Sequence, residues 1–240
     1  MCRHLGYVGP PVPVHAPVTR GGHSLRRQAW APNDMRGGGT INADGFGVAW
    51  WTPDGAPARY RSPHPVWTDP ALDEVLSQIT STAVLGAVRS ATVGMPTSRE
   101  ACAPFVDDRF AFSHNGVLPT WDAVLPAPAA SALEALTDSA AIWAALRPRL
   151  ESADPGAVLG ELVTDLAAAR PDARLNLLLC DGRTLWATAY YHSLWVSHDG
   201  ASVTIASEPT DSRPDGAGWR PVPDHSLVVA RPDSVVITAI

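Results

Sequence analysis

The chain has 240 residues, of which 45% are hydrophobic, and its 24 acidic and 18 basic residues give a formal net charge of −6. This length and apolar content fit one large globular domain or two small ones. The acidic balance and the lack of a basic cluster argue against a nucleic-acid partner, and the sequence predicts neither a membrane span nor a secretory signal.

The first half of the chain predicts mainly strands. An apolar strand begins at Leu5 and gives way at Gly9-Pro10-Pro11 to a polar segment. Hydrophobic periodicity and turn residues then predict, in order, a short helix near 24–30, a hairpin of strands 45–51 and 59–61, a helix over 69–78, and strands over 83–88 and 110–112.

The middle of the chain is helical and the last third returns to strands. Residues 129–169 are rich in alanine and leucine and predict two helices, broken near Pro148 and restarted after Asp154-Pro155. Asp-Gly and Pro-Asp turns separate the later strands, which are predicted at 175–180, 184–190, 194–197, 203–206, 227–230 and 235–238. Strands joined by short turns around a helical block predict an α+β fold with antiparallel sheets. No repeat or linker divides it, so residues 1–240 are expected to form a single domain.

The cysteines predict a reducing environment. Cys2, Cys102 and Cys180 are odd in number and widely spaced, so neither a disulfide framework nor a CxxC metal motif is predicted. The cytoplasm is therefore the expected compartment. No cofactor or metal is predicted, although the spacing leaves His192 and His198 open as ligands. All 18 basic residues are arginine, which excludes a lysine Schiff base.

Cys2 is the most informative residue because it directly follows the initiator methionine. Removal of Met1 is expected before a small residue and would leave one residue with both a thiol and a free α-amino group. An amine with a pKa near ~7.7–8.0 is partly unprotonated at neutral pH and can take the thiol proton. The alternative is a buried, inert cysteine, which is a common fate of free thiols.

Three later segments carry polar groups suited to a site. Arg89 follows a predicted buried strand, with Thr92 close behind, and its guanidinium can bind a carboxylate through two parallel hydrogen bonds. Asn115-Gly116 is typical of a type I′ turn, or of an oxyanion site in which the amide and the next backbone N–H donate to one point. Asp138 is a candidate N-cap for the following helix, or a carboxylate for an ammonium group.

Taken in this order, the segments resemble the class II glutamine amidotransferases, which belong to the N-terminal nucleophile hydrolases. The opening residues 1–7 and Ala206-Ser207-Glu208-Pro209 more specifically resemble the γ-glutamyl-hercynylcysteine S-oxide hydrolases of the ergothioneine pathway. The matching segments are Cys2, Asp44-Gly45-Phe46-Gly47, Arg89-Ser90-Ala91-Thr92, His114-Asn115-Gly116 and Thr137-Asp138.

The resemblance implies a four-layer αββα sandwich with two antiparallel sheets, and a catalytic group made of Cys2, Asn115 and Gly116. Cys2 would attack a γ-glutamyl amide with its own amine as base, and the other two would form the oxyanion hole. Arg89, Thr92, His114 and Asp138 would bind the substrate. Ser90 and Ala140 depart from the family pattern, in which a tryptophan and an acidic residue are frequent.

The implied reaction is hydrolysis of γ-glutamyl-hercynylcysteine S-oxide to glutamate and hercynylcysteine S-oxide. Two alternatives stay open: a stand-alone glutaminase or amidotransferase subunit that acts on glutamine or another γ-glutamyl compound with a partner, and an inactive fold used for binding. The expected partner is a small molecule, and a homodimer stays open. Trp30, Trp50 and Trp51 are candidates to bind a trimethylammonium group through cation–π attraction.

Overall fold

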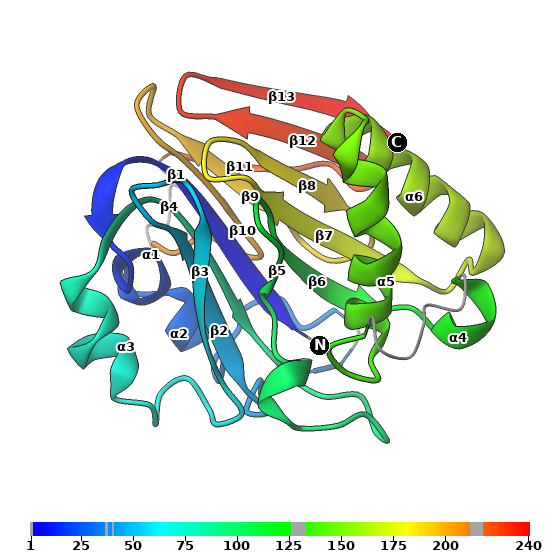
Figure 1. Cartoon of the computed structure of the whole chain (residues 1–240), viewed down its shortest axis with the longest axis horizontal. Helices are drawn as coiled ribbons and strands as arrows, with labels where there is room; N and C mark the ends of the chain where they lie inside the picture. The colour runs from blue at the N-terminus through cyan, green and yellow to red at the C-terminus, as the bar shows by residue number, and fades with distance from the viewer. Residues whose placement is uncertain (1, 37, 40, 126–132, 212–217) are drawn as a thin grey trace.

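Two antiparallel sheets face each other at the centre of the molecule (Figure 1). The computed structural model describes residues 2–36, 38–39, 41–125, 133–211 and 218–240. The seven-stranded sheet has the order β11 (Trp219–Pro221), β9 (Trp195–His198), β10 (Val203–Ala206), β1 (Arg3–Pro13), β4 (Thr80–Val88), β2 (Phe46–Trp51) and β3 (Pro57–Ser62). The six-stranded sheet has the order β13 (Ser234–Ala239), β12 (Ser226–Arg231), β8 (Leu185–Ala189), β7 (Arg174–Cys180), β6 (Ala111–Val117) and β5 (Phe105–Val106).

Helices cover the outer face of each sheet, which gives the predicted αββα order of layers (Figure 1). Among the described residues, the short helices α1 (Ala16–Thr19), α2 (Leu25–Gln28) and α3 (Ala71–Glu74) lie on the seven-stranded sheet. The six-stranded sheet is covered by α5 (Asp138–Leu146) and α6 (Pro155–Ala169), with α4 (Trp121–Val124) beside α5. Within the described ranges, 3-10 turns lie at Leu76–Gln78, Arg99–Ala101 and Arg147–Glu151.

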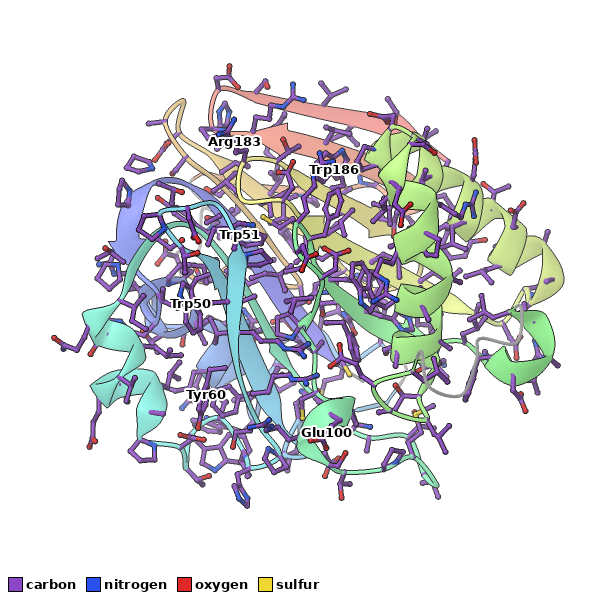
Figure 2. The ribbon with its side chains drawn as sticks, in the orientation of Figure 1. Trp50, Trp51, Tyr60, Glu100, Arg183 and Trp186 are labelled. Carbon is purple, nitrogen blue, oxygen red and sulfur yellow. The ribbon has the colours of Figure 1, made fainter. Side chains whose placement is uncertain are left out.

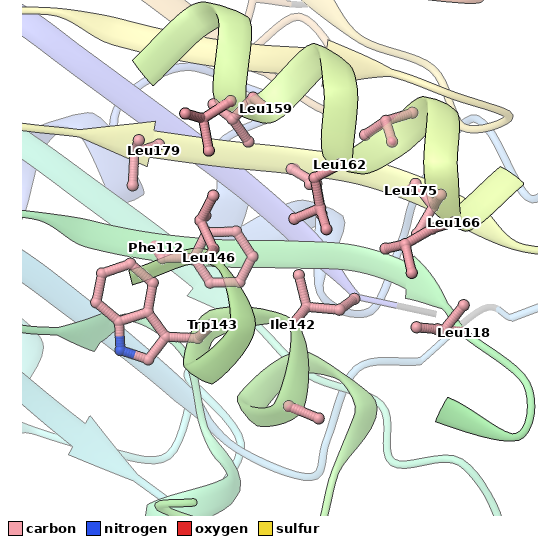
Figure 3. Close-up of a cluster of buried hydrophobic side chains, with 14 of the residues drawn as sticks. Phe112, Leu118, Ile142, Trp143, Leu146, Leu159, Leu162, Leu166, Leu175 and Leu179 are labelled. Carbon is pink, nitrogen blue, oxygen red and sulfur yellow. The ribbon is translucent and has the colours of Figure 1, made fainter. Parts of the chain in front are cut away.

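Each interface between layers has its own apolar core. The core between the six-stranded sheet and the long helices contains Phe112 on β6, which stacks on Trp143 of α5 with ring centroids 5.6 Å apart (Figure 3). Leu178, Leu185 and Val203 contribute to the core between the two sheets. Full burial of one such side chain stabilises the fold by about 1.5–3 kcal/mol. The two facing sheets are therefore held rigidly together, and this fixes the polar groups at their ends.

The structure corrects two local predictions. β1 does not stop at Gly9-Pro10-Pro11 but continues to Pro13, with a register shift between Val8 and Val12 where the prolines offer no N–H to the neighbouring strand. The helix predicted over 69–78 is only α3 and a 3-10 turn. Of the predicted helical block, residues 129–132 lie outside the described part of the chain.

Trp50 and Trp51 are the last two residues of β2 (Figure 2). Trp51 bonds through its backbone N–H to Ser81 Oγ at the start of β4, whereas Arg89 follows the end of that strand. Eight residues of extended chain span roughly 25 Å, so Trp51 lies toward the other end of β4 from Arg89. Trp50 is opposite Val84 of β4 and packs against the core beneath the short helices. Contact of either ring with the leaving group stays a prediction. Trp30 is exposed, and the Arg27 guanidinium covers its ring at 3.7 Å from the centroid.

No helix among residues 2–36, 38–39, 41–125, 133–211 and 218–240 is both long and apolar enough to cross a membrane.

Candidate active site

Cys2 directly precedes β1 in the middle of the seven-stranded sheet. Arg3 is paired with Val88 at the end of β4, so Cys2 comes beside Arg89, and its Sγ lies 3.9 Å from the Ser90 carbonyl oxygen. Met1 lies outside the described residues. His4, on the same strand face, contacts Ser113 of β6 across the gap between the sheets, with Nδ1 and Oγ 3.3 Å apart. Cys2 therefore lies where the ends of the two sheets meet.

The other two thiols are buried and unsuited to chemistry. Burial raises the pKa of the Cys102 thiol to about 11 and raises the pKa of the Cys180 thiol further. A thiol that keeps its proton at neutral pH is a poor nucleophile. Cys2 is half-buried and is the only cysteine of the chain with solvent access.

Arg89 lies at the end of β4, held by the predicted glycine-rich segment. Its backbone N–H donates to the Gly45 carbonyl at 2.8 Å, and the Asp44 carboxylate accepts from the Ala91 N–H at 2.8 Å. The guanidinium is buried, and its Nη1 has no hydrogen-bond partner among the described residues. A buried, unpaired donor costs free energy, so this nitrogen is suited to an external carboxylate. Thr92 is exposed in the following loop, and no side-chain bond between described residues joins it to Arg89.

Asn115 and Gly116 belong to strand β6, so the turn reading of this pair is wrong. The Asn115 side chain is buried, and its Nδ2 donates to Ser207 Oγ at 3.4 Å. Ser207 Oγ in turn accepts from the His4 N–H at 3.0 Å. Asn115 is thus two hydrogen bonds from the backbone that follows Cys2. An amide nitrogen carries two hydrogens, and the second is available to a ligand.

Gly116 has no room for a side chain. A Cβ at this position would lie 1.8 Å from the Arg174 carbonyl oxygen and 2.6 Å from His114 Nε2. Glycine is therefore required by the close approach of strand β7, whatever else its backbone does.

His114 connects the strand to the Asp138 carboxylate. Its Nε2 lies 2.8 Å from the Arg174 carbonyl oxygen and its Nδ1 lies 3.1 Å from Ser139 Oγ and 4.0 Å from Asp138 Oδ2. Both ring nitrogens thus contact protein groups. Asp138 is the first residue of α5 and accepts from the Leu118 N–H at 2.9 Å. Thr137, not Asp138, caps the helix, because Thr137 Oγ1 accepts from the Ala140 N–H.

Glu208 anchors the segment that begins β1, a contact that sequence reasoning missed. Its buried carboxylate pairs with the buried Arg3 guanidinium and with His23, and accepts from the backbone N–H groups of Asn33 and Asp34 at 2.9 and 3.0 Å. Burial alone would raise the pKa of Glu208, but His23 and Arg3 hold it below its ordinary value. The only indication of this contact in the sequence was the Ser207-Glu208 pair, which belongs to the segment that resembles the hydrolase branch.

We predict that Glu208→Gln destabilises the fold by about 3–5 kcal/mol, because it leaves the Arg3 guanidinium buried without a counter-charge. The matched control is Glu161→Gln, which removes an exposed partner of Arg149 and is expected to cost less than about 1 kcal/mol. Urea unfolding at pH 7.5 measures both free energies. Equal losses in the two variants would contradict a structural role for the buried pair.

Two buried histidines make the stability of the fold depend on pH. Burial lowers the pKa of His4 from its ordinary 6.5 to about 3, and burial together with the Arg174 charge does the same for His192. The unfolded chain therefore takes up protons below pH 6.5 that the folded chain refuses, and stability falls as the pH falls from 6.5 toward 3.

We predict a loss of about 1.4 kcal/mol per histidine for each pH unit well below 6.5. Urea unfolding at pH 7.5, 6.0 and 5.0 measures it. His4→Leu removes one titrating group and is expected to flatten the slope by one proton. An unchanged slope in this variant would refute the assignment to His4.

No group of three His, Cys, Asp or Glu side chains that could hold a metal ion occurs in the part of the chain that the structure describes.

Comparison with known proteins places the chain in a family. The family model described as glutamine amidotransferases class-II matches residues 28–202, which is more than half of the sequence. The chain belongs to the class II glutamine amidotransferase family.

Within this family, similar proteins carry a more specific name. A protein of Mycobacterium tuberculosis called gamma-glutamyl-hercynylcysteine sulfoxide hydrolase is 41% identical over 100% of this chain and 97% of its own length. A protein of the same name from Mycolicibacterium smegmatis is 37% identical over 99% of both chains. The resemblance to this branch, predicted from the first and late segments, is confirmed.

Solved structures agree on the fold. A glutamine aminotransferase class-II domain protein from Silicibacter pomeroyi superposes with a TM-score of 0.65 at 22% identity, over 99% of this chain and 98% of the other. The glutamine phosphoribosylpyrophosphate amidotransferase of B. subtilis gives 0.67 at 15% identity, over 99% of this chain and 49% of the other. The predicted fold class is confirmed.

Proposed function

We propose that this protein is a cysteine-dependent amidohydrolase that cleaves the γ-glutamyl amide of γ-glutamyl-hercynylcysteine S-oxide, releasing glutamate and hercynylcysteine S-oxide. The names of the relatives that match over nearly their full length support the substrate. The free state of all three cysteines is consistent with a reducing compartment, and we place the reaction in the cytoplasm. We further propose that residues 1–240 act as one domain.

The proposal is supported by the position of Cys2 beside the chain that follows Arg89, and by the hydrogen bonds that join Asn115 to the start of β1. Cys2 Sγ lies beside the backbone of the residue after Arg89, whose buried Nη1 is unpaired, and Asn115 is joined to the start of β1 through Ser207. A nucleophile, a carboxylate receptor and an amide donor thus meet at one end of the two sheets. A γ-glutamyl group needs these three functions.

We propose the following roles for these groups. Once Met1 is removed, the Cys2 amine takes the thiol proton, and the thiolate attacks the γ-carbonyl carbon. Asn115 Nδ2 and the Gly116 N–H donate to the oxyanion. The protonated amine gives its proton to the leaving nitrogen as the C–N bond breaks, and a thioester remains. Water then attacks the thioester, glutamate leaves, and the thiol is restored.

The glutamyl end is held by charge in this proposal. Arg89 binds the α-carboxylate and Asp138 the α-ammonium, with Thr92 near the carboxylate. His114 holds the Asp138 side of the site through its contact with Ser139. Two opposite charges at fixed separation align the γ-carbonyl with Cys2, and such alignment lowers the barrier by reducing the entropy cost of the reaction.

The test compares γ-glutamyl-hercynylcysteine S-oxide with glutamine as substrates of the purified protein. Mass spectrometry follows glutamate and the released amine, and also gives the mass of the mature chain. We expect the sulfoxide to have the higher kcat/KM and Met1 to be absent. A preference for glutamine would overturn the proposed substrate and favour an ammonia-donating glutaminase.

A further inference from the structure

Arg174 lies on the strand that pairs with the candidate oxyanion residues. It opens β7 opposite Val117 of β6, and its carbonyl oxygen is the atom that a Gly116 side chain would strike. The same oxygen contacts His114 Nε2 at 2.8 Å. The backbone of Arg174 is therefore fixed against His114 and Gly116, the residues on either side of Asn115.

The Arg174 side chain has no carboxylate partner among the described residues, a property that it shares with Arg89 but not with Arg3 or Arg36. Arg3 pairs with Glu208, and Arg36 forms a two-pronged pair with Asp34 while donating to the Tyr191 carbonyl. The half-buried Arg174 instead lies over the Tyr191 ring, 4.5 Å from its centroid. Its charge remains available to an anion.

Tyr191 forms a fixed platform for this guanidinium. It adopts a φ of 90°, a conformation that is unfavourable for a non-glycine residue and that persists only where the surroundings enforce it. Its N–H donates to Asp224 Oδ1 at 2.8 Å, and its carbonyl accepts from Arg36 at 3.1 Å. The side chain is nevertheless 39% exposed. Strain held at an exposed aromatic is typical of a ligand contact.

The segment that carries Tyr191 is also bonded to the strand residue opposite Asn115. Asn176, the partner of Asn115 on β7, is fully buried and makes three hydrogen bonds to the segment around Tyr191. Its Nδ2 donates to the His192 carbonyl at 2.9 Å, and its Oδ1 accepts from the N–H groups of Tyr190 and His192 at 3.1 and 3.0 Å. The Arg174–Tyr191 pair therefore cannot shift relative to the oxyanion residue without breaking this network.

We propose that the Arg174 guanidinium, supported by the Tyr191 ring, binds a carboxylate on the leaving group, so that the enzyme selects γ-glutamyl amides of amino acids over glutamine. This assignment rests on the proposed function. When the leaving amine is an amino acid, its α-carboxylate is one carbon away from the scissile nitrogen. A guanidinium on the strand that pairs with Asn115 and Gly116 is suited to that carboxylate, whereas ammonia released from glutamine offers nothing to bind.

The test measures kcat/KM for three substrates that share the γ-glutamyl group: γ-glutamyl-alanine, γ-glutamyl-alaninamide and glutamine. In the wild type, we expect γ-glutamyl-alanine to be preferred. Arg174→Gln is expected to lower kcat/KM for γ-glutamyl-alanine by about 10- to 100-fold, the range of a charged hydrogen bond, and to change the other two less than about threefold. Arg174→Lys keeps the charge without the planar fork and is expected to lie between.

Arg149→Gln is the matched control, because Arg149 pairs with Glu161 on α6 and is expected to change none of the three substrates. An equal loss for all three substrates in Arg174→Gln, or no loss for any of them, overturns the subsite and leaves the proposed function intact. A wild type that hydrolyses γ-glutamyl-hercynylcysteine S-oxide but cleaves none of the three overturns the subsite alone. A wild type that leaves the sulfoxide intact as well overturns the proposed function, and the subsite with it.

Discussion

Cys2→Ala is expected to abolish release of glutamate from any γ-glutamyl substrate while the fold stays intact. Among the described residues the one hydrogen bond of this small side chain is to the Ser90 carbonyl at 3.9 Å, so its loss is expected to cost little stability. Cys102 and Cys180 cannot replace it, because both are buried and the pKa of each thiol is raised. Single-turnover assays should detect no acyl-enzyme, and thermal unfolding should match the wild type. Activity above a tenth of the wild-type value would refute Cys2 as the nucleophile.

A second variant separates the thiol from the amine. Insertion of a glutamate between Met1 and Cys2 keeps the thiol but turns the Cys2 amine into an amide, which removes the proposed base. General base catalysis contributes about 10²–10⁴ in rate, and we expect a loss in that range. The control carries a protease site directly before Cys2, and cleavage should restore activity. Full activity before cleavage would show that the amine is not the base.

The sequence predicts the layers of this fold well because their signals are local. Residues 175–180 are apolar apart from Asn176 and predict a buried strand or helix segment, and the flanking turn residues decide for the strand. β6 was harder. Asn115 and Gly116, near the end of β6, have strong turn propensity. Pairing with Asn176 and Leu175 of β7 nevertheless keeps them extended. Tertiary pairing overrode a local preference, which is the usual limit of propensity arguments.

The residues of the candidate site also fall into two groups, those that the sequence indicates and those that only the fold reveals. The groups proposed to touch substrate, such as Arg89 and Asn115, stand out because their chemistry is evident from residue type and position. The groups that hold them do not. Ser207 contacts Asn115 across 92 residues and His4 across 203, and Glu208 meets Arg3 from the far end of the chain. Nothing in a local pattern reports contacts of that separation, so only the fold reveals them.

Asn115→Ala is expected to lower kcat by about 10²–10³ with little change in KM, because the Nδ2 donor acts on charge that develops only after attack. In the structure Nδ2 makes one bond, to Ser207 Oγ at 3.4 Å, and the second hydrogen is the one proposed for the oxyanion. Asn115→Asp has the same shape but places a carboxylate there, and it should be at least as inactive.

The split between kcat and KM decides whether Asn115 stabilises the transition state or merely shapes the pocket. A pocket role predicts a higher KM for both variants, since Arg89 and Asp138 would then hold the glutamyl group in a shifted position. Steady-state kinetics on γ-glutamyl-hercynylcysteine S-oxide measures both constants, and thermal unfolding checks that the buried site still packs. A fall in kcat of less than about fivefold would remove Asn115 from the oxyanion hole and leave the Gly116 N–H as its remaining proposed donor.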